Sequence, residues 1–242
     1  MPAPPRVLRH PGRPALVEDA AAALVARLGE IQAEGRVPQL ALSGDPLGFH
    51  VLTAAVARLA DSDVDQSRLS LWWTDDAFVP TDHPERHSLR ALSLIGGSLH
   101  LDPAHIHPIP SSDTYADPEA AAQQYLQELG PTTIDICLLE LGLMGQVAGL
   151  FPGFTPGPGD DVLGVTDAPC PPAARVSVGL PVINACREVW IFAAGGELAG
   201  LVAASFAGAP SLPTSRIGGR DRTWWYLDAA AAALLPFHTC TL

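Results

Sequence analysis

Apolar and polar positions follow two different periods along the first half of the chain. Apolar residues spaced three and four apart predict amphipathic helices over residues 15–35, 48–60, 84–94 and 117–130. Short, mostly apolar runs predict strands over residues 39–43, 68–76, 105–110 and 134–142. Predicted strands and predicted helices therefore largely alternate.

The second half of the chain adds further strands, a long loop and a last helix. Residues 152–172 are rich in proline and glycine, which predicts a surface excursion without regular structure. Strand-like patterning resumes over residues 174–196. Apolar residues dominate 189–209, but two glycines and a glutamate interrupt them as a strand, a turn and a helix would, which argues against a membrane span. Residues 223–235 predict a strand or turn and then a closing helix.

Strands that alternate with helices predict an α/β fold, here a doubly wound, largely parallel sheet with helices on both faces, Rossmann-like in arrangement. A chain of 242 residues has an ordinary length for such a fold, so we expect a single domain over residues 1–242. Ligands of these sheets bind beyond the carboxyl ends of the strands. The loops that follow Ser43, Trp73 and Glu140 are therefore the candidate site loops.

The charge of the chain excludes some classes of partner. Acidic residues number 26 against 14 basic ones, which gives a net charge of −12, and the basic residues are not clustered. A chain of this kind repels a phosphate backbone, so we expect no nucleic acid as a partner. All the basic residues are arginine, so there is no lysine for phosphate binding or Schiff-base chemistry.

The N-terminal segment and the cysteines carry no sign of export or of a metal. The first residues include arginines but no continuous apolar stretch, which argues against a secretion signal and predicts a cytoplasmic protein. Cys137, Cys170, Cys186 and Cys240 lie far apart, without the paired spacing of a zinc site. We expect neither a disulfide nor a bound metal.

Several stretches, in their order along the chain, resemble the 6-phosphogluconolactonase family. They are LALSGDPLGFHVL, WWTDDAFVPTDHPERHSLRAL, ELGLMGQVAGLFPG, ARVSVGLPVINACREVWIFAAGGELAGLV and WWYLDAAAAALL. The resemblance covers roughly residues 38–235, and an ordered series of motifs is fairly specific for a fold. The same fold family includes glucosamine-6-phosphate deaminases, but the phrase LPVINACREVWIF and the ending LFPG favour the lactonase branch.

The resemblance implies hydrolysis of the ring ester of 6-phosphoglucono-δ-lactone to 6-phosphogluconate, a step of the pentose phosphate pathway, without metal or organic cofactor. Such chemistry requires a base that deprotonates the attacking water and donors for the developing oxyanion. It also requires cations that hold the phosphate group. Each requirement can be compared with the residues that stand at the family's positions.

The first site loop and a later turn depart from the family where an anion is expected to bind. The loop reads Ser43, Gly44, Asp45, whereas the family has serine, glycine and glycine. Asp45 therefore adds a carboxylate beside the phosphosugar position. In the turn that reads GxxKA in the family, Leu198 stands at the position of the lysine. Both departures predict weak phosphate binding.

The second site loop reads aspartate, glutamate, arginine in the family. Here Asp75 and Asp76 match the two acids, and Ala77 replaces the arginine. One cation expected for the phosphate or the transition state is therefore missing. Asp75 and Asp76 are candidates for acid–base work at a strand end, and equally for a helix cap and a solvated loop acid.

The third site loop carries aspartate, glycine and histidine in the family, and the histidine is the expected general base. The matching positions are Met144, Gly145 and Gln146. A glutamine side chain can orient a water molecule but cannot accept its proton. We expect the three loops to form one cleft that lacks the family's base.

Other polar side chains are candidates to replace the missing groups. His83 and His87 flank the second loop, so that either could act as a displaced base, against an exposed or helix-capping role. An arginine fork can bind phosphate through two hydrogen bonds, against a surface salt bridge. The arginines considered are Arg86, Arg90, Arg175 and Arg216.

Two classes of function remain open from the sequence. The first is a 6-phosphogluconolactonase-like enzyme whose activity is weak or lost, with a phosphosugar or sugar lactone as its ligand. The second is a non-catalytic module that binds a phosphosugar or assembles with another protein, for example a pentose-phosphate enzyme. Acceleration of lactone opening above the spontaneous rate distinguishes the two.

Overall fold

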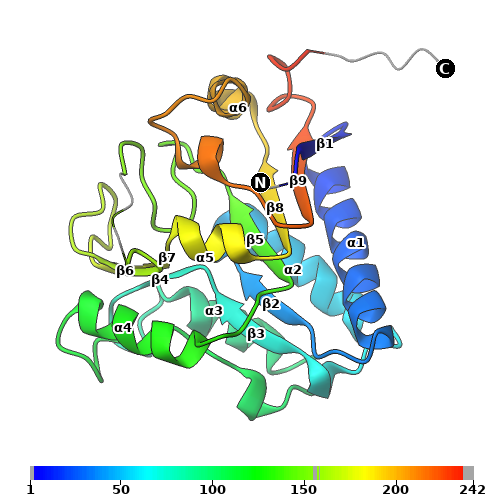
Figure 1. Cartoon of the computed structure of the whole chain (residues 1–242). Helices are drawn as coiled ribbons and strands as arrows, with labels where there is room; N and C mark the ends of the chain where they lie inside the picture. The colour runs from blue at the N-terminus through cyan, green and yellow to red at the C-terminus, as the bar shows by residue number, and fades with distance from the viewer. Residues whose placement is uncertain (1–2, 155–156, 158, 237–242) are drawn as a thin grey trace.

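A computed structural model describes residues 3–154, 157 and 159–236 of the chain. Its centre is a six-stranded sheet in the order β1-β9-β8-β5-β2-β3, in which every neighbouring pair is parallel (Figure 1). The strands are β1 (Pro5–His10), β2 (Gln39–Leu42), β3 (Ser70–Trp73), β5 (Ile136–Glu140), β8 (Glu188–Ala193) and β9 (Arg222–Asp228). The central strands are buried almost throughout, as expected of a parallel sheet covered on both faces.

Helices cover both faces of this sheet, which confirms the doubly wound α/β fold. Two helices, α1 (Arg13–Ala33) and α2 (Pro46–Leu59), pack together over one face, with α3 (His87–Ile95) beside α2. On the other face, α4 (Pro118–Leu129) and α5 (Leu180–Ala185) bury Tyr125 and Ile183 against the sheet. The remaining helices are α6 (Ala199–Phe206) and the 3₁₀ turns Gln66–Arg68, Pro103–His105, Gly196–Leu198 and Pro213–Arg216.

The direction of the chain across the sheet reverses between β2 and β5. From β2 the chain goes to the edge strand β3 and then returns to β5, on the other side of β2. From β5 it continues away from β2, through β8 to β9. A crevice opens at such a reversal, outside the carboxyl ends of the two strands, and this is where doubly wound sheets bind ligands. Here the reversal lies between the loop after Leu42 and the end of β5 at Glu140.

A second, three-stranded antiparallel sheet adjoins the carboxyl end of β3. It consists of β4 (Asp75–Ala77), β7 (Arg175–Val178) and β6 (Val162–Val165), in the order β4-β7-β6. The predicted strand 68–76 is therefore two strands in two sheets, separated at Thr74. The expectation that 152–172 lacks regular structure is wrong at β6, which pairs with β7. This pairing satisfies the backbone N–H and C=O groups of β6, and the proline and glycine content of the segment does not reveal it.

Some other elements differ from the expectations. Strand β1 was not predicted, and it completes the sheet by pairing with β9. Residues 105–110 form a single bridge, between Ile106 and Leu71, in place of a strand. After β9, the described residues 229–235 form turns where a closing helix was expected. The strand–turn–helix over 189–209 is confirmed by β8 and α6. No described helix combines the length and the apolar composition needed to cross a membrane.

The outer edge of β3 is closed by a side chain of α4. The hydroxyl of Tyr125 accepts a hydrogen bond from the Trp73 N–H at 2.9 Å and donates one to the Trp73 carbonyl at 3.0 Å. Both partners are buried, so water cannot replace the hydroxyl. Tyr125 therefore satisfies two backbone groups that an edge strand would otherwise leave open.

We predict that Tyr125→Phe lowers the free energy of unfolding by about 1–3 kcal/mol, because it leaves these two buried backbone groups without a partner. Urea denaturation followed by circular dichroism measures the change. Tyr115→Phe is the matched control, since Tyr115 is only partly buried against the core, and it is expected to change the free energy of unfolding much less. Equal stability of the Tyr125→Phe variant and the wild type would contradict the proposed role.

Candidate active site

The loop after β2 places Ser43, Gly44 and Asp45 at the start of α2. The Ser43 hydroxyl donates to Asp45 Oδ2 at 3.3 Å and accepts from the Asp45 N–H at 3.4 Å. The ring of His87 lies directly over Gly44, and a Cβ at this position would overlap the ring. Glycine at position 44 is therefore required so that α3 can bring His87 against the first site loop.

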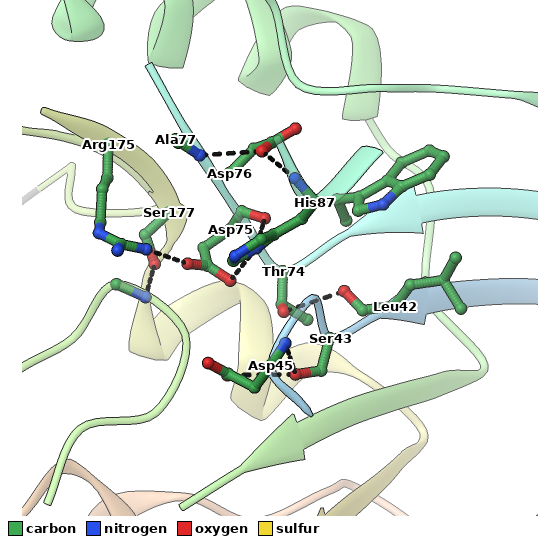
Figure 2. A network of polar contacts seen from close by, with 12 residues as sticks. Leu42, Ser43, Asp45, Thr74, Asp75, Asp76, Ala77, His87, Arg175 and Ser177 are labelled. Carbon is green, nitrogen blue, oxygen red and sulfur yellow. Dashed lines mark hydrogen bonds and ion pairs between the residues drawn. The ribbon is translucent and has the colours of Figure 1, made fainter. Parts of the chain in front are cut away.

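Asp75 lies between two cations (Figure 2). Its carboxylate oxygens are 3.4 Å from Nδ1 of His87 and 3.3 Å from a guanidinium nitrogen of Arg175, and the Asp75 carbonyl lies 3.2 Å from the same Nδ1. The side chain of Asp75 is only 1% exposed. Burial by itself raises the pKa of this carboxyl, but the charges and hydrogen bonds of His87 and Arg175 outweigh burial and lower it. Asp75 is thus a buried carboxylate that holds two cations.

Asp76 and Arg86 hold the start of α3, which carries His87, in place. Asp76 accepts hydrogen bonds from the N–H groups of His87 and Ser88, at 2.7 and 3.2 Å, and from the Ser88 hydroxyl at 2.6 Å, so that it caps the start of α3. Arg86 is 3.2 Å from the same carboxylate and donates to the Ile109 carbonyl at 2.5 Å. Both side chains are buried. The geometry therefore favours the helix-capping role for Asp76, and it does not favour a phosphate-binding role for Arg86.

The two histidines beside the second loop differ in their surroundings. His83 accepts a hydrogen bond from the Glu85 N–H, within its own turn. Burial by itself lowers the pKa of His87, but the charges of Asp75, Asp76 and Asp45 outweigh burial and raise it to about 9. His87 is therefore an imidazolium near neutral pH and is suited to stabilise negative charge. It is poorly suited to the role of displaced base that the sequence left open.

Two carboxyl groups flank the point where the strand order reverses. Asp45 follows β2, and burial together with the charge of Asp75 raises its pKa to about 6. Glu140 ends β5, and burial together with the charge of Asp45 raises its pKa to about 7. One carboxylate oxygen of Glu140 accepts hydrogen bonds from the N–H groups of Leu47 and Gly48, at 2.7 and 3.0 Å. These are groups that are suited to acid–base chemistry at neutral pH.

Glu140 was not among the candidate residues. The signal available in the sequence was a single acidic residue at the end of the apolar run ICLLE. In a parallel sheet such a residue lies at the ligand-binding edge, so this position was a signal that could have identified Glu140. Its contact with the start of α2 depends on tertiary structure.

The third site loop is held by contacts between its own residues. Gln146 Oε1 accepts a hydrogen bond from the Met144 N–H at 3.0 Å, and the Gln146 amide packs over Gly142, where a Cβ would overlap it. Gly145 has a φ of +81°, which favours glycine, and faces Leu212. In the described residues, no hydrogen bond joins the Gln146 side chain to Asp45, Asp75 or His87.

The base of this loop nevertheless reaches the second sheet. The Gly149 N–H donates to the Ser177 hydroxyl at 2.9 Å, and Ser177 pairs with Asp75 across β4 and β7 (Figure 2). The first and second loops are thus brought together as expected. The third loop approaches them through Gly149, and the exposed side chains of Leu143 and Met144 lie at its tip.

The remaining candidate positions lie apart from this cluster or inside the core. Ala77 is 0% exposed and pairs with Arg175 across β4 and β7, and Leu198 is 5% exposed within the apolar core. The guanidinium of Arg90 lies 4.8 Å from the ring centre of Phe49, and Arg216 donates to the Phe154 carbonyl at 2.6 Å. Among the four arginines considered, Arg175 is the one that joins Asp75.

The described residues contain no group of three or more histidine, cysteine, aspartate or glutamate side chains arranged to hold a metal ion. Cys137, Cys170 and Cys186 are free thiols, and Cys240 lies outside the described residues.

The candidate site consists of Ser43, Asp45, Asp75, His87, Arg175 and Glu140, which we call the acid–cation cluster. It combines near-neutral carboxyl groups with a buried imidazolium.

The chain matches the family model described as glucosamine-6-phosphate isomerases/6-phosphogluconolactonase over residues 11–225. It belongs to this family. A 6-phosphogluconolactonase of Streptomyces coelicolor is 38% identical, with 96% of this chain and 95% of the relative covered. A 6-phosphogluconolactonase of Mycobacterium tuberculosis is 32% identical, with 91% and 94% covered.

Solved structures of the family agree with the fold. A 6-phosphogluconolactonase from Leishmania guyanensis matches with a TM-score of 0.80 at 19% identity, covering 97% of this chain and 100% of that one. A monomeric glucosamine-6-phosphate deaminase matches with a TM-score of 0.78 at 17% identity, covering 95% and 99%. Because two different activities occur on this fold, the fold alone does not select between them.

We predict that Asp75→Asn lowers the pKa of His87 from about 9 toward the ordinary value of 6.5, because it removes the charge that contributes most to keeping the imidazole protonated. NMR titration of the His87 ring measures this value. The raised pKa also means that His87 stabilises the wild type below pH 6.5 and that this contribution is lost as the pH rises through 9.

The exposed carboxylate of Asp61 supplies the control, since Asp61→Asn is expected to leave the titration of His87 unchanged. A wild-type His87 that already titrates near 6.5 would show that Asp75 does not hold the proton on the ring.

Proposed function

We propose that this chain hydrolyses the ring ester of a sugar lactone, the reaction type of the 6-phosphogluconolactonases, at the acid–cation cluster and with reduced activity. The observation that carries the proposal is that the ring of His87 packs against Gly44, the residue that precedes Asp45. This arrangement brings a carboxyl group with a pKa near 6 close to an imidazolium, at the edge where doubly wound sheets bind ligands. The named relatives above 30% identity support the same reaction type.

Asp45 is the proposed general base. Its carboxylate accepts a proton from water while the water oxygen attacks the lactone carbonyl carbon. Because its pKa is about 6, much of Asp45 is ionised at neutral pH and remains basic enough to take the proton. The hydroxyl of Ser43 keeps the carboxyl group oriented through its hydrogen bond at 3.3 Å.

His87 is the proposed stabiliser of the developing charge. Its Nδ1 is directed at Asp75, so its Nε2–H is the donor available to the carbonyl oxygen or to the leaving ring oxygen. A donor placed in advance, in surroundings from which water is largely excluded, stabilises an oxyanion more than water does. When the ring C–O bond breaks, the leaving ring oxygen takes up one proton and becomes a hydroxyl group. This proton balances the one that Asp45 accepted from water, and the product is a hydroxy acid.

Gln146 accounts for the reduced activity. The family's histidine position is filled by an amide whose oxygen is already bonded to Met144. Loss of a general base typically lowers a rate by about 10²–10⁴, and a relocated carboxylate restores only part of that factor.

The buried, apolar side chains of Ala77 and Leu198 favour a second candidate, the non-catalytic binding or assembly module. A pentose-phosphate enzyme as the partner of such a module, and a cytoplasmic location, are expectations from the sequence. A purified protein that leaves lactone opening at the spontaneous rate would select this candidate.

We predict that wild-type protein accelerates lactone opening above the spontaneous rate and that Asp45→Asn removes most of this acceleration, by about tenfold to a hundredfold. Lactone disappearance at several pH values, corrected for spontaneous opening, measures the effect. The wild-type kcat/KM should rise as the pH rises through about 6, where Asp45 loses its proton, and the variant should lack this rise.

Asp61→Asn is again the matched control and should keep the wild-type rate and pH profile. An Asp45→Asn variant that retains both would place the base elsewhere in the cluster.

A further inference from the structure

Glu140 occupies the position on α2 that would otherwise receive an anion. Its carboxylate accepts the N–H groups of Leu47 and Gly48, which belong to the first turn of a 14-residue helix. The first N–H groups of a helix have no partner within the helix and attract negative charge. Here the chain supplies that charge itself, beside Ser43 and Asp45 of the first site loop.

The cations near this position are already held by carboxylates. Arg175 and His87 both contact Asp75, at 3.3 and 3.4 Å, and Asp75 is 1% exposed. Arg86 contacts Asp76 at 3.2 Å, with both side chains buried. An additional dianion at the cluster would therefore meet Asp45 and Glu140 while its attraction to the cations is largely cancelled by Asp75 and Asp76.

A groove of about 350 Å³ includes Gly149, whose N–H is bonded to Ser177, the residue that pairs with Asp75 of the cluster. One wall includes Phe151 and Phe154, and the other runs from Leu163 to Pro169. Among the described residues that line it, none is basic and Asp167 is acidic. The groove thus offers no cation that could hold a phosphate group.

We propose that the cluster selects an uncharged polyhydroxylated lactone over its phosphorylated counterpart, and that Glu140 determines this selectivity by filling the anion position on α2. The inference rests on the proposed lactonase function and narrows its substrate class. The carboxyl groups that repel a phosphate are suitable acceptors for sugar hydroxyl groups, and the Ser43 hydroxyl can donate or accept. The same residues therefore disfavour one ligand and favour the other.

The experiment compares glucono-δ-lactone with its 6-phosphate as substrates, each corrected for spontaneous opening. Wild type, Glu140→Ala and Glu140→Gln are measured, with the exposed Glu85→Gln as the matched control. A second readout is the shift of the melting temperature with inorganic phosphate, which requires no turnover. The Gln variant keeps the shape of the side chain, so it remains informative if the Ala variant is unstable.

The wild type is expected to prefer the uncharged lactone in kcat/KM by at least about tenfold, the factor that corresponds to 1.4 kcal/mol. Glu140→Ala should shift this ratio toward the phosphorylated lactone by a similar factor and gain a phosphate-dependent increase in melting temperature. Glu140→Gln should show a smaller shift in the same direction, and Glu85→Gln none. A wild-type preference for the phosphorylated lactone would overturn the proposal.

If neither lactone is hydrolysed, the proposed function has failed, and the melting temperatures decide the inference about Glu140 by themselves. Stabilisation by phosphate in Glu140→Ala but not in wild type supports it. Equal responses to phosphate in the two proteins overturn it.

Discussion

The buried carboxylate of Asp75 is the interaction on which the rest of the site depends. It joins three parts of the chain, because β4 carries it, α3 brings His87 to it and β7 brings Arg175. A charge that is buried to this extent is strongly destabilising without partners, typically by about 3–5 kcal/mol when one partner of a buried pair is removed. The two cations must therefore stay in place in the folded state. Their placement fixes the small sheet and α3 relative to the loop after β2.

The same constraint explains why the chain leaves the parallel sheet at Thr74. The Thr74 N–H still donates to the Leu42 carbonyl, but the next residue pairs with Ser177 of β7. Asp75 is thereby directed at the start of α2, where Gly44 leaves space for the ring of His87. The side chain of Asp76 leaves the same short strand on the opposite side and caps the start of α3. Two adjacent acids thus have different roles, one toward the site and one toward the helix behind it.

The sequence predicted the elements whose signal is local. Helix α4 was expected over 117–130 and spans Pro118–Leu129, because the spacing of its apolar residues and its capping Asp117 are both readable in the chain. The small sheet was not predicted, because β4 and β6 are short and β4 pairs with β7 from a distant part of the chain. Asp45, Asp75, His87 and Arg175 were named as candidates, but the fact that one buried carboxylate holds both cations depends on tertiary pairing. Glu140 was missed although its place at the end of a buried strand was readable, and only its contact with the start of α2 depends on tertiary structure.

The substitutions at the site fall into two physical kinds. Ala77 and Leu198 are both buried, and Leu198 is part of the apolar core, so neither position offers the expected cation. Asp45, at a position where the family has glycine, and Glu140 are carboxyl groups at the crevice, and burial and nearby negative charge raise the pKa of both. A site that had only decayed would have no reason to place carboxyl groups in such surroundings.

Burial of Asp45 and Glu140, together with the negative charges near them, has a cost for folding that depends on pH. Both carboxyl groups have pKa values above their ordinary 3.8 and 4.5, so the folded state binds their protons more tightly than the unfolded chain does. Their contribution to stability is therefore present below about pH 4 and is lost as the pH rises through about 6 and then about 7. Near neutral pH the protein keeps two carboxyl groups where they are least favourable for folding. Such a conflict is typical of residues retained for chemistry, since acid–base catalysis requires groups that titrate near the working pH.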